Sequence, residues 1–148
     1  MKSKTVIKKI YTMTLAFFLI SVLLGVTSIA AQQSEPVLEI YEVKSGLGQV
    51  ILTVKNTGDL AADQLVMSII VTGGIAGRID ITKICAGCGG CSNSLQPNET
   101  KTESTAEEAI IFGFGVISIT VSAEASNAQT VEQTLSGFVI GPIILISS

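Results

Sequence analysis

Three cysteines at two-residue spacing are the feature of this 148-residue chain most suited to chemistry. Cys85, Cys88 and Cys91 stand in a glycine-rich stretch, which would let their sulfurs converge on one metal ion or cluster. A closed metal site needs a fourth ligand, and the chain has no histidine and no fourth cysteine. A metal would have to recruit Asp80, water or a second copy of the chain, so we predict no cofactor.

Disulfide chemistry is the other use of Cys85, Cys88 and Cys91, and it suits a protein outside the cytosol. Two of the thiols would pair locally, while the third stays spare or bridges to another molecule because the count is odd. Redox catalysis is a further alternative, but a thioredoxin-type C-x-x-C motif lies at a helix N-terminus and no helix is expected after Cys91. All three residues are therefore disulfide candidates.

The remaining residue types give no catalytic constellation. Without histidine there is no Ser-His-Asp or Cys-His arrangement. Glu103, Glu107 and Glu108 could be compared with the acid pair of a glycosidase, but they lack aromatic neighbours, and a solvated strand face explains them. Asp59 and Asp63 lack the dense carboxylate spacing of a calcium loop and suit turn capping. We therefore predict that the chain is not an enzyme.

One modification site is suggested by the sequence. Asn98, Glu99 and Thr100 form an N-x-T acceptor within a stretch expected to be an exposed loop. Asn98 is therefore a glycosylation candidate if the host performs that reaction.

Residues 49–72 contain two strand-like runs, which would help to position the loop that holds the cysteines and Asn98. In the first run Val50, Leu52 and Val54 share one face, which predicts a strand buried on that side. In the second run, 64–72, Leu65, Met67, Ile69 and Val71 share one face, but the other face is also rather apolar, which suits a strand inside a two-sheet stack. We expect a turn at 56–59 between the two runs. Its Asn and Asp side chains can bond nearby amides, and its glycine accepts positive φ. A hairpin and a sheet-to-sheet crossover fit equally well.

Further strands are expected along the rest of the chain, and a loop is expected at 85–98. They are predicted at 36–43, 78–84, within 99–109, and at 116–123, 130–140 and 143–147. The strand at 78–84 is expected to be bent or at an edge, and the last strand is expected at an edge. About seven to nine short strands predict an all-β, immunoglobulin-like Greek-key sandwich. We expect aliphatic packing plus Phe112, Phe114 and Phe138 to form its core.

Three sequence stretches resemble the CARDB-type and related immunoglobulin-like domains of prokaryotic surface proteins. They read V-K-N-T-G-D from Val54, A-A-D-Q-L-V-M-S-I from Ala61 and L-Q-P-N-E-T from Leu95. Where those families have glycine in a P-G-E motif this chain has Asn98, which also visits positive φ. The resemblance covers residues 36–148. It implies an extracellular adhesion-related or spacer module without a family active site.

The first thirty residues predict export. Lys2, Lys4, Lys8 and Lys9 precede an apolar run at 13–26, and small residues before Ala31 suit cleavage. The alternative is an uncleaved helix that anchors the protein in a membrane, because 13–31 approaches the roughly 20 residues that span a bilayer. We expect a signal peptide or anchor at 1–30, a linker at 31–35 and the sandwich at 36–148, in a secreted or cell-surface protein.

Charge limits the partners of the mature chain. Removing thirty residues leaves 118, with five basic residues against twelve acidic ones and a net charge of −7. Nucleic acid is therefore excluded as a partner, and a membrane is expected only through an uncleaved N-terminal segment. We expect contact with other surface or extracellular proteins, and a disulfide-linked or edge-strand homo-oligomer is compatible with the sequence.

These observations lead to one main hypothesis and two alternatives. The main one is a secreted or surface immunoglobulin-like module for protein contact, adhesion or structural spacing, without catalysis. The first alternative is a Cys-loop module that binds a metal, or exchanges or crosslinks disulfides. The second is a membrane-anchored subunit that polymerises through its N-terminal helix.

Overall fold

The computed structural model describes residues 35–86 and 94–147, all of which fall within one compact unit, Ser34–Ser148. Its regular elements are antiparallel strands and two short 3-10 turns, and no α-helix occurs in these residues. The strands are β1 Leu38–Gly46, β2 Gln49–Asn56, β3 Ala62–Asp63, β4 Val66–Gly73, β5 Ile79–Ala86, β6 Ser94–Leu95, β7 Thr100–Ser104, β8 Gly113–Ala125, β9 Ala128–Gly141 and β10 Ile143–Ser147. The 3-10 turns are η1 Ile75–Gly77 and η2 Thr105–Glu107.

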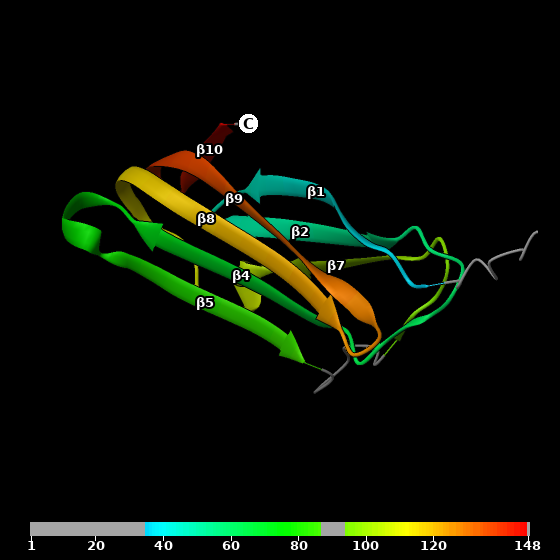
Figure 1. Cartoon of the computed structure of the whole chain (residues 1–148). Coiled ribbons are helices and arrows are strands. Elements are labelled where there is room, and N and C mark those ends of the chain that lie inside the picture. The colour runs from blue at the N-terminus through cyan, green and yellow to red at the C-terminus, as the bar shows by residue number, and fades with distance from the viewer. Residues whose placement is uncertain (1–34, 87–93, 148) are drawn as a thin grey trace, which may run out of the picture. The chain divides into compact units, whose positions relative to one another are not determined.

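Two sheets form two layers over one core (Figure 1). The first has the order β1-β2-β7, and the second has the order β10-β9-β8-β4-β5. The short strands β3 and β6 pair with each other. Buried side chains from both sheets belong to one cluster, so the all-β prediction is confirmed. β5 and β10 are the edges of the larger sheet, as the sequence predicted.

Alternation along the strands determines which side chains enter this core. Val50, Leu52 and Val54 of β2 are fully buried, as predicted. The same holds for the inward face of β4, for Leu65 before it, and for the inward face of β8, where the buried side chains are Met67, Ile69, Val71, Ile117, Ile119 and Val121. Because the side-chain period of a strand is two, each sheet places one face against the other and one toward solvent.

The expectation that phenylalanines fill the core is wrong for two of them. Phe112 and Phe114 are 72% and 54% exposed, and Phe138 is half-buried. Phe114 has the same parity as the outward Ser118 of β8, so strand geometry turns its ring outward. Ile111 is fully buried in the connection before β8 and takes the inward place beside Phe112.

Residues 56–63 form a crossover between the sheets rather than a hairpin, because β2 and β4 belong to different sheets. Asn56 is fully buried and makes four side-chain hydrogen bonds. Its Oδ1 accepts from the amides of Val37 at 3.2 Å and Gly58 at 3.0 Å. Its Nδ2 donates to the carbonyls of Leu60 at 2.7 Å and Leu95 at 2.9 Å. One amide group therefore uses both donors and both oxygen lone pairs to join the entering chain at Val37, the crossover itself and β6 at Leu95.

Gly58 is required for a different reason than the sequence suggested. Its φ is not positive. Instead, a Cβ at this position would meet backbone atoms of the incoming chain, including Glu35 O and, at 2.5 Å, Val37 N. Close approach of two backbones therefore explains the glycine.

Strand limits differ from prediction near residues 85–109. β5 continues through Ala86, and β6 begins at Ser94, so part of the predicted loop at 85–98 is strand. β7 stops at Ser104, where η2 begins with Ser104 Oγ accepting a hydrogen bond from Ala106 N. The predicted N-terminal helix and residues 87–93 lie outside the described residues. Within the part described, no helix is long and apolar enough to cross a membrane.

Candidate functional site

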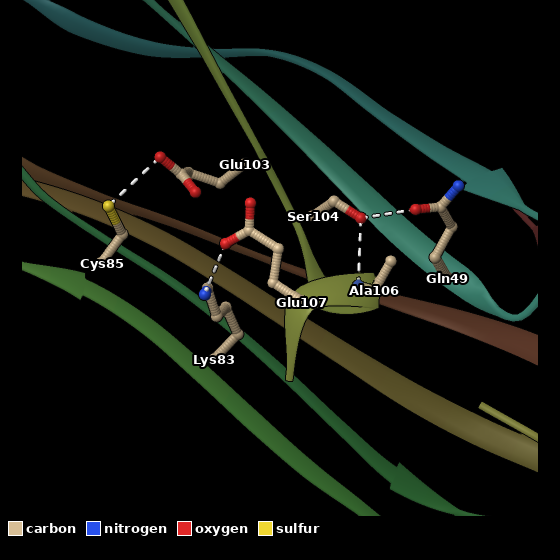
Figure 2. A network of polar contacts seen from close by, with 7 residues as sticks. All are labelled: Gln49, Lys83, Cys85, Glu103, Ser104, Ala106 and Glu107. Atoms are coloured by element: carbon tan, nitrogen blue, oxygen red, sulfur yellow. Dashed lines mark hydrogen bonds and ion pairs between the residues drawn. The ribbon is translucent and has the colours of Figure 1, made fainter. Parts of the chain in front are cut away.

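The cysteine motif is described at its first residue only. Cys85 lies in β5, is 5% exposed, and its sulfur is disulfide-bonded. Cys88 and Cys91 lie outside the described residues, so the partner of Cys85 stays a prediction. The sulfur is 3.1 Å from Oε1 of Glu103 on β7 (Figure 2). A thiol can donate across this distance but a disulfide sulfur has no proton, so the contact is a hydrogen bond only in the reduced state.

The acidic residues near η2 have structural partners. Nζ of Lys83 on β5 donates to Oε2 of Glu107 at 3.0 Å (Figure 2). The hydrogen bond from Lys83 to Glu107 raises the pKa of Lys83, opposed by its partial desolvation and aided by the charges of Glu107, Glu108 and Glu103. The pair joins the edge of the larger sheet to the segment that follows β7. Glu103, Glu107 and Glu108 therefore lie around the charged group of Lys83. The acid pair of a glycosidase is instead arranged around a substrate.

Two hydroxyl groups hold the start of η2. Ser104 Oγ donates to Oε1 of Gln49 at 2.6 Å and accepts from Ala106 N at 3.1 Å (Figure 2). The buried Oγ1 of Thr105 accepts from Val50 N at 3.0 Å. The contacts with Gln49 and Val50 attach η2 to β2, and the contact with Ala106 caps η2 itself, so this network has a structural role.

Asn98 lies on an exposed turn with φ of +62°, so the expectation that asparagine takes a left-handed conformation here is confirmed. Its backbone amide donates to the carbonyl of Asn56 at 2.8 Å. The side chain is exposed, which glycosylation requires, and the modification itself stays a prediction.

The described residues contain no group of three or more His, Cys, Asp or Glu side chains that could hold a metal ion. Asp59 and Asp63, considered for calcium, belong to the polar crossover. The backbone of Asp63 pairs with Asn127 Oδ1 and with Ser126 N, which fixes the turn between β8 and β9 against the crossover.

The outward face of the larger sheet carries an apolar surface that sequence analysis missed. Six side chains from β8, β9 and β10 stand in two cross-strand rows, which we call the outer-face patch: Phe114, Ile140 and Ile143 in one row, and Val116, Phe138 and Leu145 in the other. Five of the six are exposed, and the rings of Phe114 and Phe138 meet edge to face with centroids 5.2 Å apart. The alternation of the strand predicted at 116–123 would have revealed this patch. Phe114 and Val116 face the opposite way to Ile117 and Ile119, which are buried.

A polar row bounds this patch along the sheet. Thr72, Ser118, Ser136 and Ser147 stand side by side on β4, β8, β9 and β10. Beyond them the outward face continues with hydroxyl pairs, such as Thr120 with Thr134 at 3.2 Å. One sheet face is therefore divided into an apolar part and a hydroxyl-rich part.

Exposed apolar side chains also occupy the adjoining turns, at the end where β4 stops and β5 starts (left in Figure 1). We call them the turn tips: Leu47, Ile75, Ile110 and Phe112. Backbone hydrogen bonds hold two of these turns and the β9–β10 turn together, from Gly48 N to Pro142 O at 2.6 Å and from Ile111 N to Gly48 O at 2.7 Å. The turn tips therefore rest on a fixed backbone.

A hollow of about 710 Å³ lies between the turn tips and the outer-face patch. Ile75, Phe112 and Phe114 line it with Arg78 and several glycines. It offers apolar contact and one guanidinium, without a second polar group of the kind that orients a small substrate. The hollow suits an apolar side chain of a partner better than a reaction.

Comparison with known proteins gives no functional assignment. No family model matches the chain, and no curated protein matches it. Among solved structures it is similar to a β-glucosidase from Listeria innocua in complex with glucose, at 18% identity and a TM-score of 0.33. The similarity covers 73% of this chain and 17% of that one, so the chain spans a small part of the enzyme. A likeness this low bears on neither fold nor activity.

Proposed function

We propose that this chain is an exported, non-catalytic immunoglobulin-like module that acts by protein contact, adhesion or structural spacing at the cell surface or in the medium. The outer-face patch carries the proposal. Soluble proteins rarely leave large apolar side chains adjacent and exposed unless a partner covers them. Here they occupy two complete cross-strand rows beside four apolar turn tips.

The strand order supports a Greek-key immunoglobulin topology, and the CARDB-related kind is proposed from the sequence resemblance. In immunoglobulin domains the strands A, B and E share one sheet, while C, F and G share the other. β1, β2 and β7 have the places of A, B and E, and β4, β8 and β9 have those of C, F and G. β5 pairs with β4 as the C′ strand does in variable-type domains, and β10 extends the sheet beyond β9.

The compartment and the class of partner are inferred from the sequence. A basic start and an apolar run before Ala31 favour export, with membrane attachment only where that segment is retained. Twelve acidic residues against five basic ones beyond residue 30 disfavour nucleic acid. Surface or extracellular proteins are the partners that these features favour.

The experiment compares partner binding by three forms of the full chain produced in its own host. They are the natural chain, a Phe112→Ser/Phe114→Ser variant, and an Ile84→Ser control that removes an exposed side chain from the other part of the same sheet face. Chemical crosslinking in the intact culture, followed by mass spectrometry, identifies what each form contacts. We expect the natural chain and the control to share protein contacts that the double variant loses. Identical contacts for all three would contradict the proposal.

A second candidate is a Cys-loop module that crosslinks or exchanges disulfides, which the disulfide bond at Cys85 favours. Replacing Cys85, Cys88 and Cys91 with serine separates the two. A contact module keeps its β-sheet circular dichroism and its crosslinked partners, whereas a thiol-dependent role disappears. We propose that Cys85 pairs within the motif, and that no metal or cofactor is needed.

A further inference from the structure

The outer-face patch and the turn tips form one continuous apolar surface, with Arg78 as the charged residue that lines the hollow between them. Phe114 lies beside Ile140 across the strands, and the hollow joins Phe114 to Phe112 and Ile75. Ten large apolar side chains, most of them about half exposed, present on the order of 700 Å². A standard stable interface buries about 800 Å² on each partner, so this surface alone is close to the size that a stable pair requires.

Charge restricts what can cover this surface. Residues 35–147 carry all twelve acidic residues of the chain and five basic ones, so two copies repel each other over most of their surfaces. The outer-face patch and the turn tips consist of ten uncharged residues, and Arg78 is the charged residue among those that line the hollow. Two copies can therefore approach most easily through this face.

We propose that the occupant is a second copy of this chain, packed face to face through the outer-face patch around a two-fold axis. A two-fold interface needs only one self-complementary surface. Sheets commonly pack in this way, about 10 Å apart, with interdigitating apolar side chains. The inference deepens the proposed function, on which it rests, by naming the partner.

Pairing along the edge strand β10 is the competing geometry for a second copy. Its five residues, IILIS, contain no charge or proline, features that commonly protect an exposed edge. Edge pairing would extend the sheet but leave Phe114, Val116 and Ile140 in water, because outward side chains stay outward when a strand is added. Face-to-face packing covers them and the outward side chains of β10 together.

Strand β1 separates the point where the chain enters the sandwich from the turn tips. The chain enters the described structure at Glu35–Val37, beside Gly58, and β1 then runs to Gly46 next to the turn tips. A nine-residue strand spans about 30 Å. The point where the chain enters the sandwich and the turn tips therefore lie at opposite ends of β1.

The test is sedimentation equilibrium of the full chain as its host exports it, with reductant present to remove disulfide-linked species. Val116→Glu places a carboxylate within the patch, beside Phe138, at a side chain that is 67% exposed. Ile84→Glu adds the same charge to the other part of the same face, at a side chain that is 61% exposed. We expect a dimer for the natural chain and for Ile84→Glu, and at least a hundredfold weaker association for Val116→Glu.

A second variant protects the test against misfolding. Leu145→Gln removes an exposed apolar contact without adding charge, and we expect about tenfold weaker association with unchanged circular dichroism. A monomeric natural chain at the highest soluble concentration would overturn the inference. So would a Val116→Glu dimer, since association through the N-terminal segment or the β10 edge survives that change.

The two proposals fail in distinguishable ways. If the natural chain is monomeric but loses crosslinks to another protein when Phe112 and Phe114 are replaced, the second copy is wrong and the contact function stands. If neither self-association nor crosslinking depends on the patch, both are wrong.

Discussion

The two ends of the sandwich use their exposed turns in opposite ways. At one end the buried Asn56 amide satisfies four backbone groups, and Asn127 bonds the same crossover from the β8–β9 turn. At the other end the turn tips and the outer-face patch expose apolar side chains that serve no internal contact of comparable kind. The polar end is explained by the fold alone, whereas the apolar end is the surface to which we assign the proposed contact.

The largest effect is expected at the polar end. Asn56→Ala would leave two amides and two carbonyls around a buried site without their partner, so we expect the free energy of unfolding to fall by about 3 to 4 kcal/mol. Asn127→Ala is the matched control, because it removes an exposed asparagine with two bonds at the same end and should cost about 1 kcal/mol. Urea unfolding measures both, and equal losses would contradict the role assigned to Asn56.

Two adjacent isoleucines sharpen the comparison at the apolar end. Ile111 is fully buried, while Ile110 is 71% exposed. Ile111→Ala should cost about 2 to 4 kcal/mol through the cavity that it leaves. Ile110→Ala should change the free energy of unfolding of the dilute chain by no more than about 0.5 kcal/mol. A large loss for Ile110→Ala would show that the turn tips stabilise their own chain.

The smallest effect is expected for the ion pair between Lys83 and Glu107. Because Glu107 raises the pKa of Lys83, the protonated lysine is favoured by folding. Its contribution is therefore complete below the ordinary lysine pKa of 10.5 and is lost as pH rises through the raised pKa of the folded chain. The stability difference between the natural chain and Lys83→Met should shrink above pH 10.5. Lys44→Met controls for loss of a lysine, and a pH-independent difference would refute the assignment.

Alternation predicted the buried strands because the side-chain period of a strand is two, so the pattern can be read from the local sequence alone. The buried face of Val50, Leu52 and Val54 is confirmed, whereas in β4, where both faces looked apolar, the structure buries Met67, Ile69 and Val71. Phe112 and Phe114 were misplaced because residue type was used in place of parity. Extending the pattern of Ile117 and Ile119 backward would have put Phe114 and Val116 on the outward face.

The polar cluster shows what a local pattern cannot predict. The bond from Gly58 N to Asn56 lies two residues away and was expected from turn chemistry. The partners Val37 and Leu95 are 19 and 39 residues from Asn56, and they meet it only because the sheets stack. The outer-face patch is similar, since its rows combine residues from β8 and β10 that are about thirty positions apart.

The strand order also dictates when the larger sheet can be completed during synthesis. β4 pairs with β5 on one side and with β8 on the other, and Ile69 faces Val121 across that second ladder. A nascent chain that ends before Gly113 therefore holds β4 with one side unpaired and half of the core without cover. Long-range pairing of this kind slows folding and prolongs the exposure of apolar strands, so the larger sheet is completed only once about the last quarter of the chain has been synthesised.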